Sequence, residues 1–111
     1  MQRFILLLDL IDDLELIRQY EKYHESIPTE IQESILASGI ESMKMFRFEN
    51  RLCMEILAND DFNFAQKTKM DADNPAVQAW ETLMSNYQLT IPGTPQGVKW
   101  VLANPIFSLT K

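Results

Sequence analysis

A histidine and a tyrosine one helical turn apart are the residues of this chain best suited to proton transfer. His24 is the only histidine among the 111 residues, and it follows Tyr20 by four positions. Side chains at positions i and i+4 share one face of an α-helix, so the phenol and the imidazole should lie together. An imidazole titrates at about pH 6.5. The pair is therefore suited to general acid–base chemistry near neutral pH.

A structural role for His24 is the alternative interpretation, because a lone histidine on a partly apolar helix often only packs and satisfies hydrogen bonds. Spacing alone leaves both roles open. The sequence offers few residues for metal binding, phosphate binding or nucleophilic catalysis. One histidine and one cysteine cannot build a Cys/His metal site, and three glycines supply no phosphate-binding loop or nucleophile elbow. We expect no metal.

The residues before and around the pair predict a strand followed by a helix. An apolar run, Phe4–Ile11, ends at two aspartates, and Asp12 followed three residues later by Glu15 resembles a capping box. One side of the predicted helix carries Leu14, Ile17, Tyr20 and His24. Pro28 should break this helix.

The rest of the chain predicts a hairpin and further helices. Residues 28–38 form a helical segment before Gly39, a good C-cap residue, and two alternating runs, 40–48 and 51–58, indicate paired strands. Two asparagine-containing sequences, Asn59-Asp60-Asp61 and Asn74-Pro75, predict helices to about 70 and about 87. A loop with prolines and glycines at 92–97 then precedes a last, interrupted strand over 98–109.

This order predicts an α+β fold of the ferredoxin-like type, with a four-stranded antiparallel sheet and helices on one face. The second sheet face needs a cover, because Ile5, Leu7 and Ile11 make it nearly as apolar as the first. We expect two copies to pack sheet to sheet, as a dimeric α+β barrel. The alternative is a monomer in which the loop around Pro92–Pro95 covers that face.

Length and composition bound the function. We expect one domain over residues 1–111, with 46% hydrophobic and 23% charged side chains. The net charge of −6, without a cluster of lysine or arginine, argues against nucleic acid or an anionic membrane as a partner. A neutral or cationic small molecule fits better. A single cysteine, Cys53, and no membrane-spanning run predict a cytoplasmic protein.

Several short motifs, in this order, resemble the L-rhamnose mutarotase family over essentially the whole chain. They are Tyr20-x-x-x-His24, Ile27 with Glu30, Gly39 before the hairpin, Pro75-x-Val77-Gln78-x-Trp80, Gly97-x-x-Trp100 and Ile106-Phe107-x-Leu109. The resemblance implies a homodimeric ferredoxin-like enzyme without metal or organic cofactor. Its members interconvert the α and β anomers of a 6-deoxyhexopyranose, L-rhamnose or in some relatives L-fucose.

The resemblance also implies roles for individual residues. The histidine matching His24 is the proton donor of the family, and residues matching Tyr20 and Trp80 contact the sugar. Two further sugar contacts of the family differ here: Met43 stands where a tyrosine is usual, and Glu81 where a second tryptophan is usual. The usual Trp-Pro-Glu after the histidine is Ile27-Pro28-Thr29-Glu30 here. The substrate-binding set is therefore Tyr20, Met43, Trp80 and Glu81.

The chemistry of mutarotation suits these residue types, since it consists of proton transfers to and from the oxygens of a cyclic hemiacetal. We expect His24 to protonate the ring oxygen, with Tyr20 or a carboxylate, Glu30 or Glu81, acting on the anomeric hydroxyl. Two other functions stay open on the same fold. One is a cofactor-free monooxygenase, and the other is a non-catalytic module that binds sugar or mediates interactions.

Overall fold

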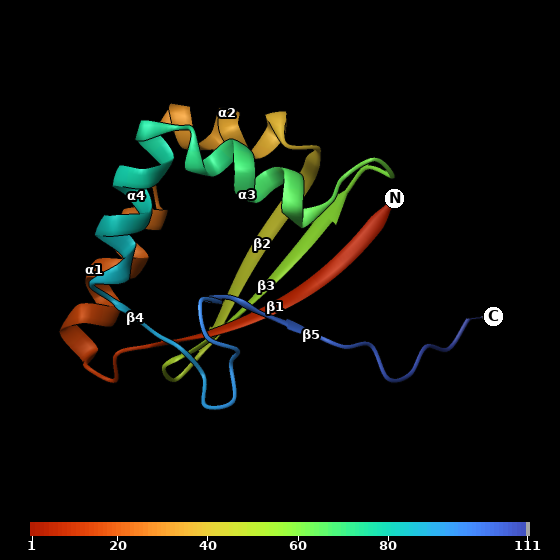
Figure 1. Cartoon of the computed structure of the whole chain (residues 1–111). Helices are drawn as coiled ribbons and strands as arrows, with labels where there is room; N and C mark the ends of the chain where they lie inside the picture. Colours follow the sequence, from red (N-terminus) through yellow and green to blue (C-terminus); the bar gives the residue numbers. More distant parts are fainter. Residues whose placement is uncertain (111) are drawn as a thin grey trace.

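The computed structural model describes residues 1–110, so the last residue of the expected 1–111 domain lies outside it. The elements in chain order are β1 (Gln2–Leu10), α1 (Leu14–His24), α2 (Thr29–Ala37), β2 (Ile40–Phe48), β3 (Arg51–Ala58), α3 (Phe64–Ala72), α4 (Pro75–Ser85), β4 (Gln88–Leu89) and β5 (Val101–Ala103). The helices gather on one side of the sheet, and the C-terminal segment extends away from them (Figure 1).

The sheet is antiparallel and has five strands, not the predicted four, and its main strand order is β2-β3-β1-β4. β5 also pairs with β1, along Ile5–Leu7, while β4 pairs with Asp9 and Leu10. These two short strands therefore share one edge of β1. The predicted α+β class with an antiparallel sheet and one-sided helices is confirmed, and the predicted hairpin has the expected bounds.

The end of the chain differs from the prediction. The strand expected over 98–109 is limited to Val101–Ala103, and β4 was not predicted at all. The helix expected to reach Tyr87 ends at Ser85, because Asn86 is its C-cap. Two strand residues carry no alternating pattern, so β4 leaves no signal in the sequence.

Helix starts were predicted with mixed success. Asn74 caps α4 by accepting hydrogen bonds from the next turn, as expected. The cap of α1 is Asp13, not Asp12, since the carboxylate of Asp13 accepts from the amide of Leu16 at 3.0 Å. The cap of α3 is Asn63, and the expected cap sequence at 59–61 forms a turn instead.

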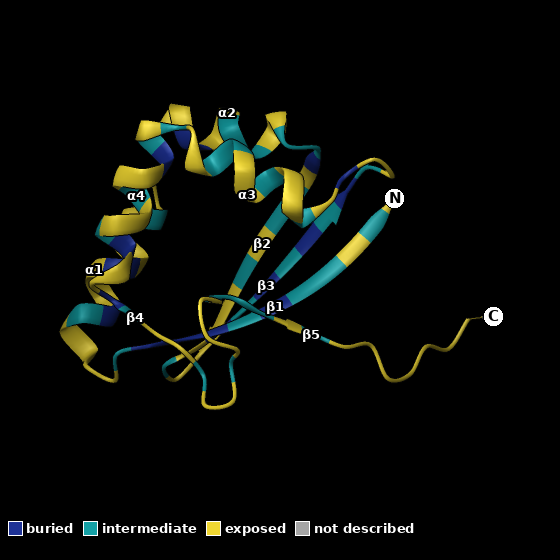
Figure 2. Ribbon diagram, in the orientation of Figure 1, coloured by how far each residue is buried: buried dark blue, intermediate teal, exposed yellow. Residues whose placement is uncertain are grey.

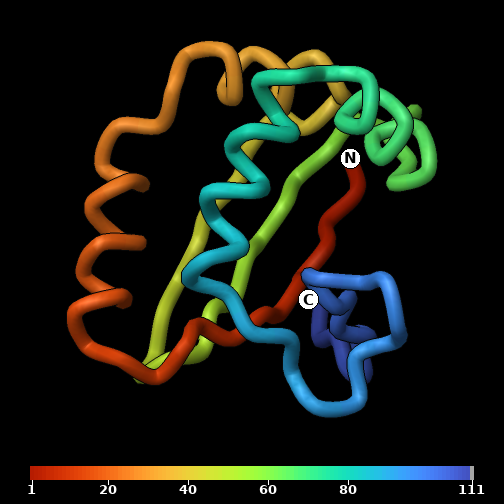
Figure 3. Tube along the Cα trace, turned by 60° about the vertical axis from the view of Figure 1, so that its left-hand side comes forward, coloured from red at the N-terminus to blue at the C-terminus, as the bar shows by residue number. Residues whose placement is uncertain are grey.

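The core lies between the helices and the sheet. Strand residues that face the helices are buried: Leu6, Leu8, Leu10, Leu52, Met54, Ile56 and Ala58. Figure 2 shows this burial alternating along the strands. α1 and α4 lie side by side over one end of the sheet (Figure 3), and the ring of Trp80 contacts Tyr23 and His24 across this helix pair.

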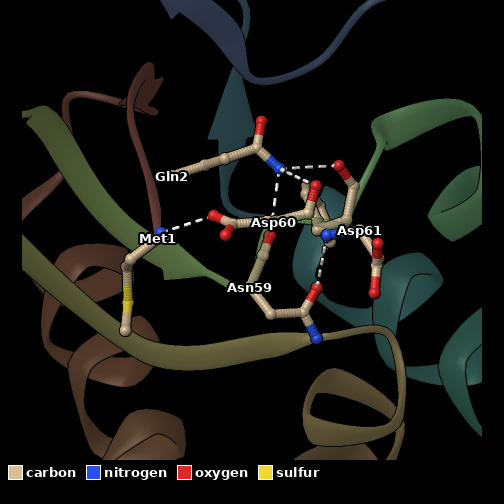
Figure 4. A network of polar contacts seen from close by, with 6 residues as sticks. Met1, Gln2, Asn59, Asp60 and Asp61 are labelled. Atoms are coloured by element: carbon tan, nitrogen blue, oxygen red, sulfur yellow. Dashed lines mark hydrogen bonds and ion pairs between the residues drawn. The ribbon is translucent and has the colours of Figure 1, made fainter.

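The opposite end of the sheet is held by a polar network around the turn after β3 (Figure 4). The side-chain nitrogen of Gln2 donates to the carbonyls of Asn59 at 3.0 Å and Phe62 at 2.9 Å. The Asn59 side chain in turn accepts from the amide of Asp61. Gly39 meets the same turn with φ at +103°, and a Cβ there would lie 3.1 Å from Asn59. The start of β1, the end of α2 and this turn therefore form one tightly packed corner.

Within the described residues, no helix is both long and apolar enough to cross a membrane.

Candidate functional site

The predicted pair lies at the C-terminal end of α1 and makes direct contact. The ring centroids of Tyr20 and His24 are 4.4 Å apart, with 36° between the ring planes. Tyr20 is buried against the core, and His24 is half-buried. The one-turn spacing therefore brings the two rings onto the same helix face, as the sequence predicted.

The hydrogen bond made by His24 fixes which nitrogen can do chemistry. Nδ1 lies 2.8 Å from the backbone carbonyl of Tyr20. A carbonyl only accepts, so Nδ1 carries the proton and donates it. Nε2 then holds the lone pair in the neutral ring and a second proton in the imidazolium. His24 is thereby oriented to accept or donate a proton through Nε2.

Tyr20 is held by a residue from the far end of the chain. The side-chain nitrogen of Gln88 on β4 donates to the Tyr20 hydroxyl at 3.2 Å, and the hydroxyl lies 3.9 Å from the sulfur of Met45 on β2. Burial raises the pKa of Tyr20, and the hydrogen bond from Gln88 partly opposes that rise. The phenol therefore keeps its proton at neutral pH and acts as a hydrogen-bond donor.

Two hollows open beside the pair, between the helices and β2. The Tyr20 hollow has a volume of about 210 Å³ and is lined by Tyr20, Glu21, His24, Glu25, Met45, Phe46, Arg47 and Leu52. The Met43 hollow, of about 470 Å³, is lined mainly by residues of α2 and β2, including Met43. His24 and Glu25 belong to both walls. His24 therefore stands where the two hollows meet.

An ion pair forms part of the wall of the Tyr20 hollow. The guanidinium of Arg47 contacts both carboxylate oxygens of Glu21, at 3.1 and 3.3 Å, and donates to the carbonyl of Glu49. Glu25, on the same wall, has no ion-pair partner among the described residues. The hollow thus combines an imidazole, a protonated phenol and, in Glu25, a carboxylate that forms no ion pair among the described residues.

The other predicted site residues are spread more widely. Met43 lines the Met43 hollow, beside residues of α2. Trp80 packs edge-on against His24, with centroids 5.6 Å apart, but it lines neither hollow. Glu81 and Glu30 are exposed and also lie outside both walls. Their roles in substrate binding or proton transfer stay predictions.

Sequence reasoning missed several residues that the fold brings to the pair. Gln88, Met45 and Arg47 come from strands, and no motif in the sequence connects them with α1. The only signal in the sequence was for Glu21 and Glu25, which directly follow Tyr20 and His24 at the same helix end. Among residues 1–110, no group of three or more metal-ligating side chains comes together.

The arrangement can move protons on an uncharged, hydroxyl-rich molecule. His24 offers an exchangeable proton at Nε2, Tyr20 offers a donor that does not ionise near neutral pH, and Glu25 offers an acceptor. The apolar parts of the walls, Met45 and Leu52, suit the C–H surface of such a molecule.

Comparison with known proteins gives a consistent picture. The family model of the L-rhamnose mutarotases matches residues 3–109. An L-fucose mutarotase of Xanthomonas campestris is 41% identical over 100% of this chain and 90% of its own length. A UPF0734 protein of Dictyostelium discoideum is 34% identical over 80% of this chain and 72% of its own.

Two solved structures share the fold. The L-rhamnose mutarotase of Formosa agariphila superposes with a TM-score of 0.72, covering 99% of this chain and 100% of that one, at 16% identity. The tetracenomycin F2 cyclase of Streptomyces glaucescens superposes with a TM-score of 0.63, covering 100% and 99%, at 20% identity. Both support the α+β architecture described above.

Proposed function

This chain belongs to the L-rhamnose mutarotase family, and we propose that it interconverts the α and β anomers of a 6-deoxyhexopyranose by acid–base opening and closure of the ring. The observation that carries the proposal is the position of His24. Its Nδ1 is anchored on the helix, and its ring forms part of both hollow walls beside the buried phenol of Tyr20.

Ring opening moves two protons. The His24 imidazolium gives its Nε2 proton to the ring oxygen as the bond from that oxygen to the anomeric carbon breaks. The anomeric hydroxyl loses its proton to a carboxylate of the wall and becomes the aldehyde oxygen. Of the two carboxylates there, Glu21 is engaged by Arg47, so Glu25 is the better acceptor. Glu30 and Glu81 lie outside the walls.

Ring closure reverses these transfers on the other face of the carbonyl. The aldehyde turns about its bond to the neighbouring carbon, the hydroxyl attacks, and its proton returns to His24. The former carbonyl oxygen regains a proton from the carboxyl group. Tyr20 donates a hydrogen bond to a sugar oxygen throughout, because its raised pKa keeps the phenol protonated. Only protons move, so the reaction needs no redox partner.

Two substrates are consistent with the family and its relatives, L-rhamnose and L-fucose. These sugars differ in the configuration of their hydroxyl groups, which polar wall residues would distinguish. Met43 lines the Met43 hollow at a position where the family resemblance implies a tyrosine, and we propose that this change alters sugar preference and not proton transfer. The hydrogen bonds that hold His24 and Tyr20 are made with the Tyr20 carbonyl and with Gln88, not with Met43.

The test is NMR exchange spectroscopy between the α and β anomer signals of each sugar near neutral pH. Wild type should accelerate exchange, and His24→Ala and His24→Gln should lose about 100-fold or more of that acceleration, the size of one general acid–base group. Arg18→Ala is the matched control, since Arg18 is exposed on the same helix and outside both walls. Sugar binding without exchange by wild type would instead identify a binding module.

We also propose a homodimer packed through the outer face, the side of the sheet turned away from the helices. A row of paired outer residues crosses four strands: Phe46, Cys53, Leu7 and Val101. Phe46 is 56% exposed and Phe48 is 79% exposed, so the loop around Pro92–Pro95 does not cover them. An apolar face of this kind is typical of an interface between copies.

The dimer is tested by light scattering coupled to gel filtration. Wild type should elute with the mass of two chains, and Phe46→Glu should shift it toward one. Leu14→Glu is the matched control, because Leu14 is 63% exposed but lies at the start of α1. A wild-type mass of one chain at micromolar concentration would contradict the proposal.

A further inference from the structure

We propose that Gln88 is a positioning residue for Tyr20: its side-chain N–H occupies a lone pair of the phenol oxygen and so directs the phenol proton toward the Tyr20 hollow. This inference rests on the proposed function. It adds a residue from β4 to a site that is otherwise built from α1, β2 and β3.

The position of Gln88 is set by the backbone of the sheet. Gln88 pairs with Leu10, a core residue that is 1% exposed, at the end of β1. The preceding residue, Tyr87, is also buried, and its hydroxyl donates to Gln19 on α1 at 3.0 Å. The amide is therefore presented to Tyr20 from a strand that pairs with buried Leu10 and follows buried Tyr87.

The geometry around the phenol leaves its proton one weak partner. A tyrosine hydroxyl has one proton and can also accept. Gln88 uses the accepting side at 3.2 Å, and the remaining neighbour is the Met45 sulfur at 3.9 Å. A thioether is a weak acceptor, and Met45 lines the hollow. A sugar hydroxyl or ring oxygen is a stronger acceptor, so it would replace the sulfur as the acceptor of the hydrogen bond that the phenol donates.

The side-chain oxygen of Gln88 lowers the stability of the fold. Its Oε1 is buried without a hydrogen-bond partner. Among the described residues, no other buried side-chain nitrogen or oxygen lacks one. A buried acceptor without a partner is costly, and such groups in native proteins call for an explanation. An apolar side chain of similar size would avoid the cost. The benefit of the amide therefore lies in its contact with Tyr20.

Few charged groups surround this contact. His24 and Tyr87 are the titratable residues whose rings face Tyr20, with centroids at 4.4 and 6.1 Å. Glu21, Glu25 and Arg47 stand on the wall of the hollow. None of them donates to the phenol oxygen, so within the described residues Gln88 is its hydrogen-bond donor, and the phenol proton is left to face Met45 and the hollow.

The main test compares activity with stability in Gln88→Leu. Anomer exchange should slow by about tenfold, the rate equivalent of one neutral hydrogen bond. The melting temperature should stay equal or rise, because the unpartnered Oε1 is gone. A merely structural role predicts that both fall together. Gln96→Leu, in an exposed loop, is the matched control and should change neither value.

A second variant tests the direction of the hydrogen bond. In Gln88→Glu, the introduced carboxyl can donate to the phenol only when protonated. After subtraction of uncatalysed exchange, its activity should approach wild type at low pH and fall as the carboxyl ionises. Wild type should lack this added step. Unchanged activity in Gln88→Leu, or a Gln88→Glu profile parallel to wild type, would overturn the proposal.

A third measurement does not depend on catalysis. Ultraviolet difference titration of tyrosinate, with Tyr20→Phe to identify the Tyr20 signal, should show this phenol ionising at higher pH in Gln88→Leu than in wild type. If wild type fails to exchange either sugar but this titration shifts, the proposed function is wrong and the positioning contact stands. If the titration does not shift, the positioning contact itself is wrong.

Discussion

Two glutamines at opposite ends of the sheet make different sets of hydrogen bonds. At the corner beside the start of β1, the Gln2 side-chain nitrogen donates to three backbone carbonyls, of Asn59, Asp60 and Phe62, and so ties the turn after β3 to the strand (Figure 4). At the other end, Gln88 donates to a single side chain, Tyr20, and leaves its own oxygen buried without a partner.

The difference separates a corner that stabilises the fold from the end of the sheet where we propose that the sugar binds, the ligand end. Backbone carbonyls must be satisfied, so the contacts of Gln2 stabilise the fold directly. The contact of Gln88 leaves a buried polar atom unpaired, and it lies beside a hollow lined by an imidazole and a phenol. Local departures from good packing of this kind are expected at functional sites.

Removal of the Tyr20 hydroxyl should have the largest effect on the difference between the two ends. Tyr20→Phe should lower anomer exchange by about 100-fold, because the hydrogen bond to the sugar is lost in the transition state. Exchange rates from NMR at saturating sugar measure this. The same protein should also lose about 1 kcal/mol of stability, since the Gln88 nitrogen then lacks its acceptor.

The double variant Tyr20→Phe/Gln88→Leu sharpens this result. It should regain the stability lost in Tyr20→Phe, because both polar partners are gone and the buried oxygen with them. Its activity should stay as low as that of Tyr20→Phe. Activity restored together with stability would show that the two residues matter only for folding.

Much of the fold was predictable because its signals are local. The hairpin β2–β3 has the predicted bounds, since two alternating runs flank a short turn. Asn74-Pro75 marks the start of α4 because a cap side chain and a first-turn proline act within one turn. Asp12 and Asp13 have the same chemistry, however, and only the backbone geometry selects Asp13 as the cap of α1.

The contact between Tyr20 and His24 was predictable from helix geometry, whereas Met43 and Trp80 were expected only from the family resemblance. Tyr20 and His24 are one turn apart on α1, so their contact follows from helix geometry. Gln88 is 68 residues from Tyr20, and it reaches the phenol only through the pairing of β4 with β1. The sequence 59–61 was read as a helix cap, whereas its residues satisfy the corner network instead. Such long-range contacts leave no periodic pattern.

At the stable corner, Gly39 should be the most sensitive position. Gly39→Ala would place a Cβ 3.1 Å from the Asn59 side chain on a backbone with φ at +103°. We expect about 2 kcal/mol of destabilisation from the strained backbone and the crowding. Urea unfolding measures it, and the exchange rate of the folded fraction should match wild type. A loss of rate without a loss of stability would mean that the corner and the ligand end are coupled.

Gln2→Ala tests the same corner more mildly. It removes the donor for three carbonyls, and we expect a loss of about 1 kcal/mol. Activity should be unchanged, in contrast to the slower exchange and the equal or higher stability expected of Gln88→Leu. Urea unfolding and NMR exchange on the two variants, measured side by side, provide opposite patterns. Matching patterns would remove the distinction between the two ends.

The smallest expected effect is the alkaline dependence of stability at the ligand end. Burial raises the pKa of Tyr20 above its ordinary value of 10.0, so the folded protein holds the phenol proton where the unfolded chain has lost it. Stability from this group is complete below pH 10 and is lost as the pH rises through the folded pKa. One proton limits the slope to about 1.4 kcal/mol per pH unit.

The comparison with Tyr20→Phe isolates this contribution. Tyr87, whose pKa is also raised by burial, is present in both proteins, so its titration cancels in the difference. Urea unfolding at several values above pH 10 should show wild type losing stability more steeply than Tyr20→Phe. Gln88→Leu should lose its Tyr20 contribution at higher pH than wild type, because the hydrogen bond that lowers this pKa is gone. Identical slopes in all three proteins would mean that the phenol is not held in its buried, protonated state.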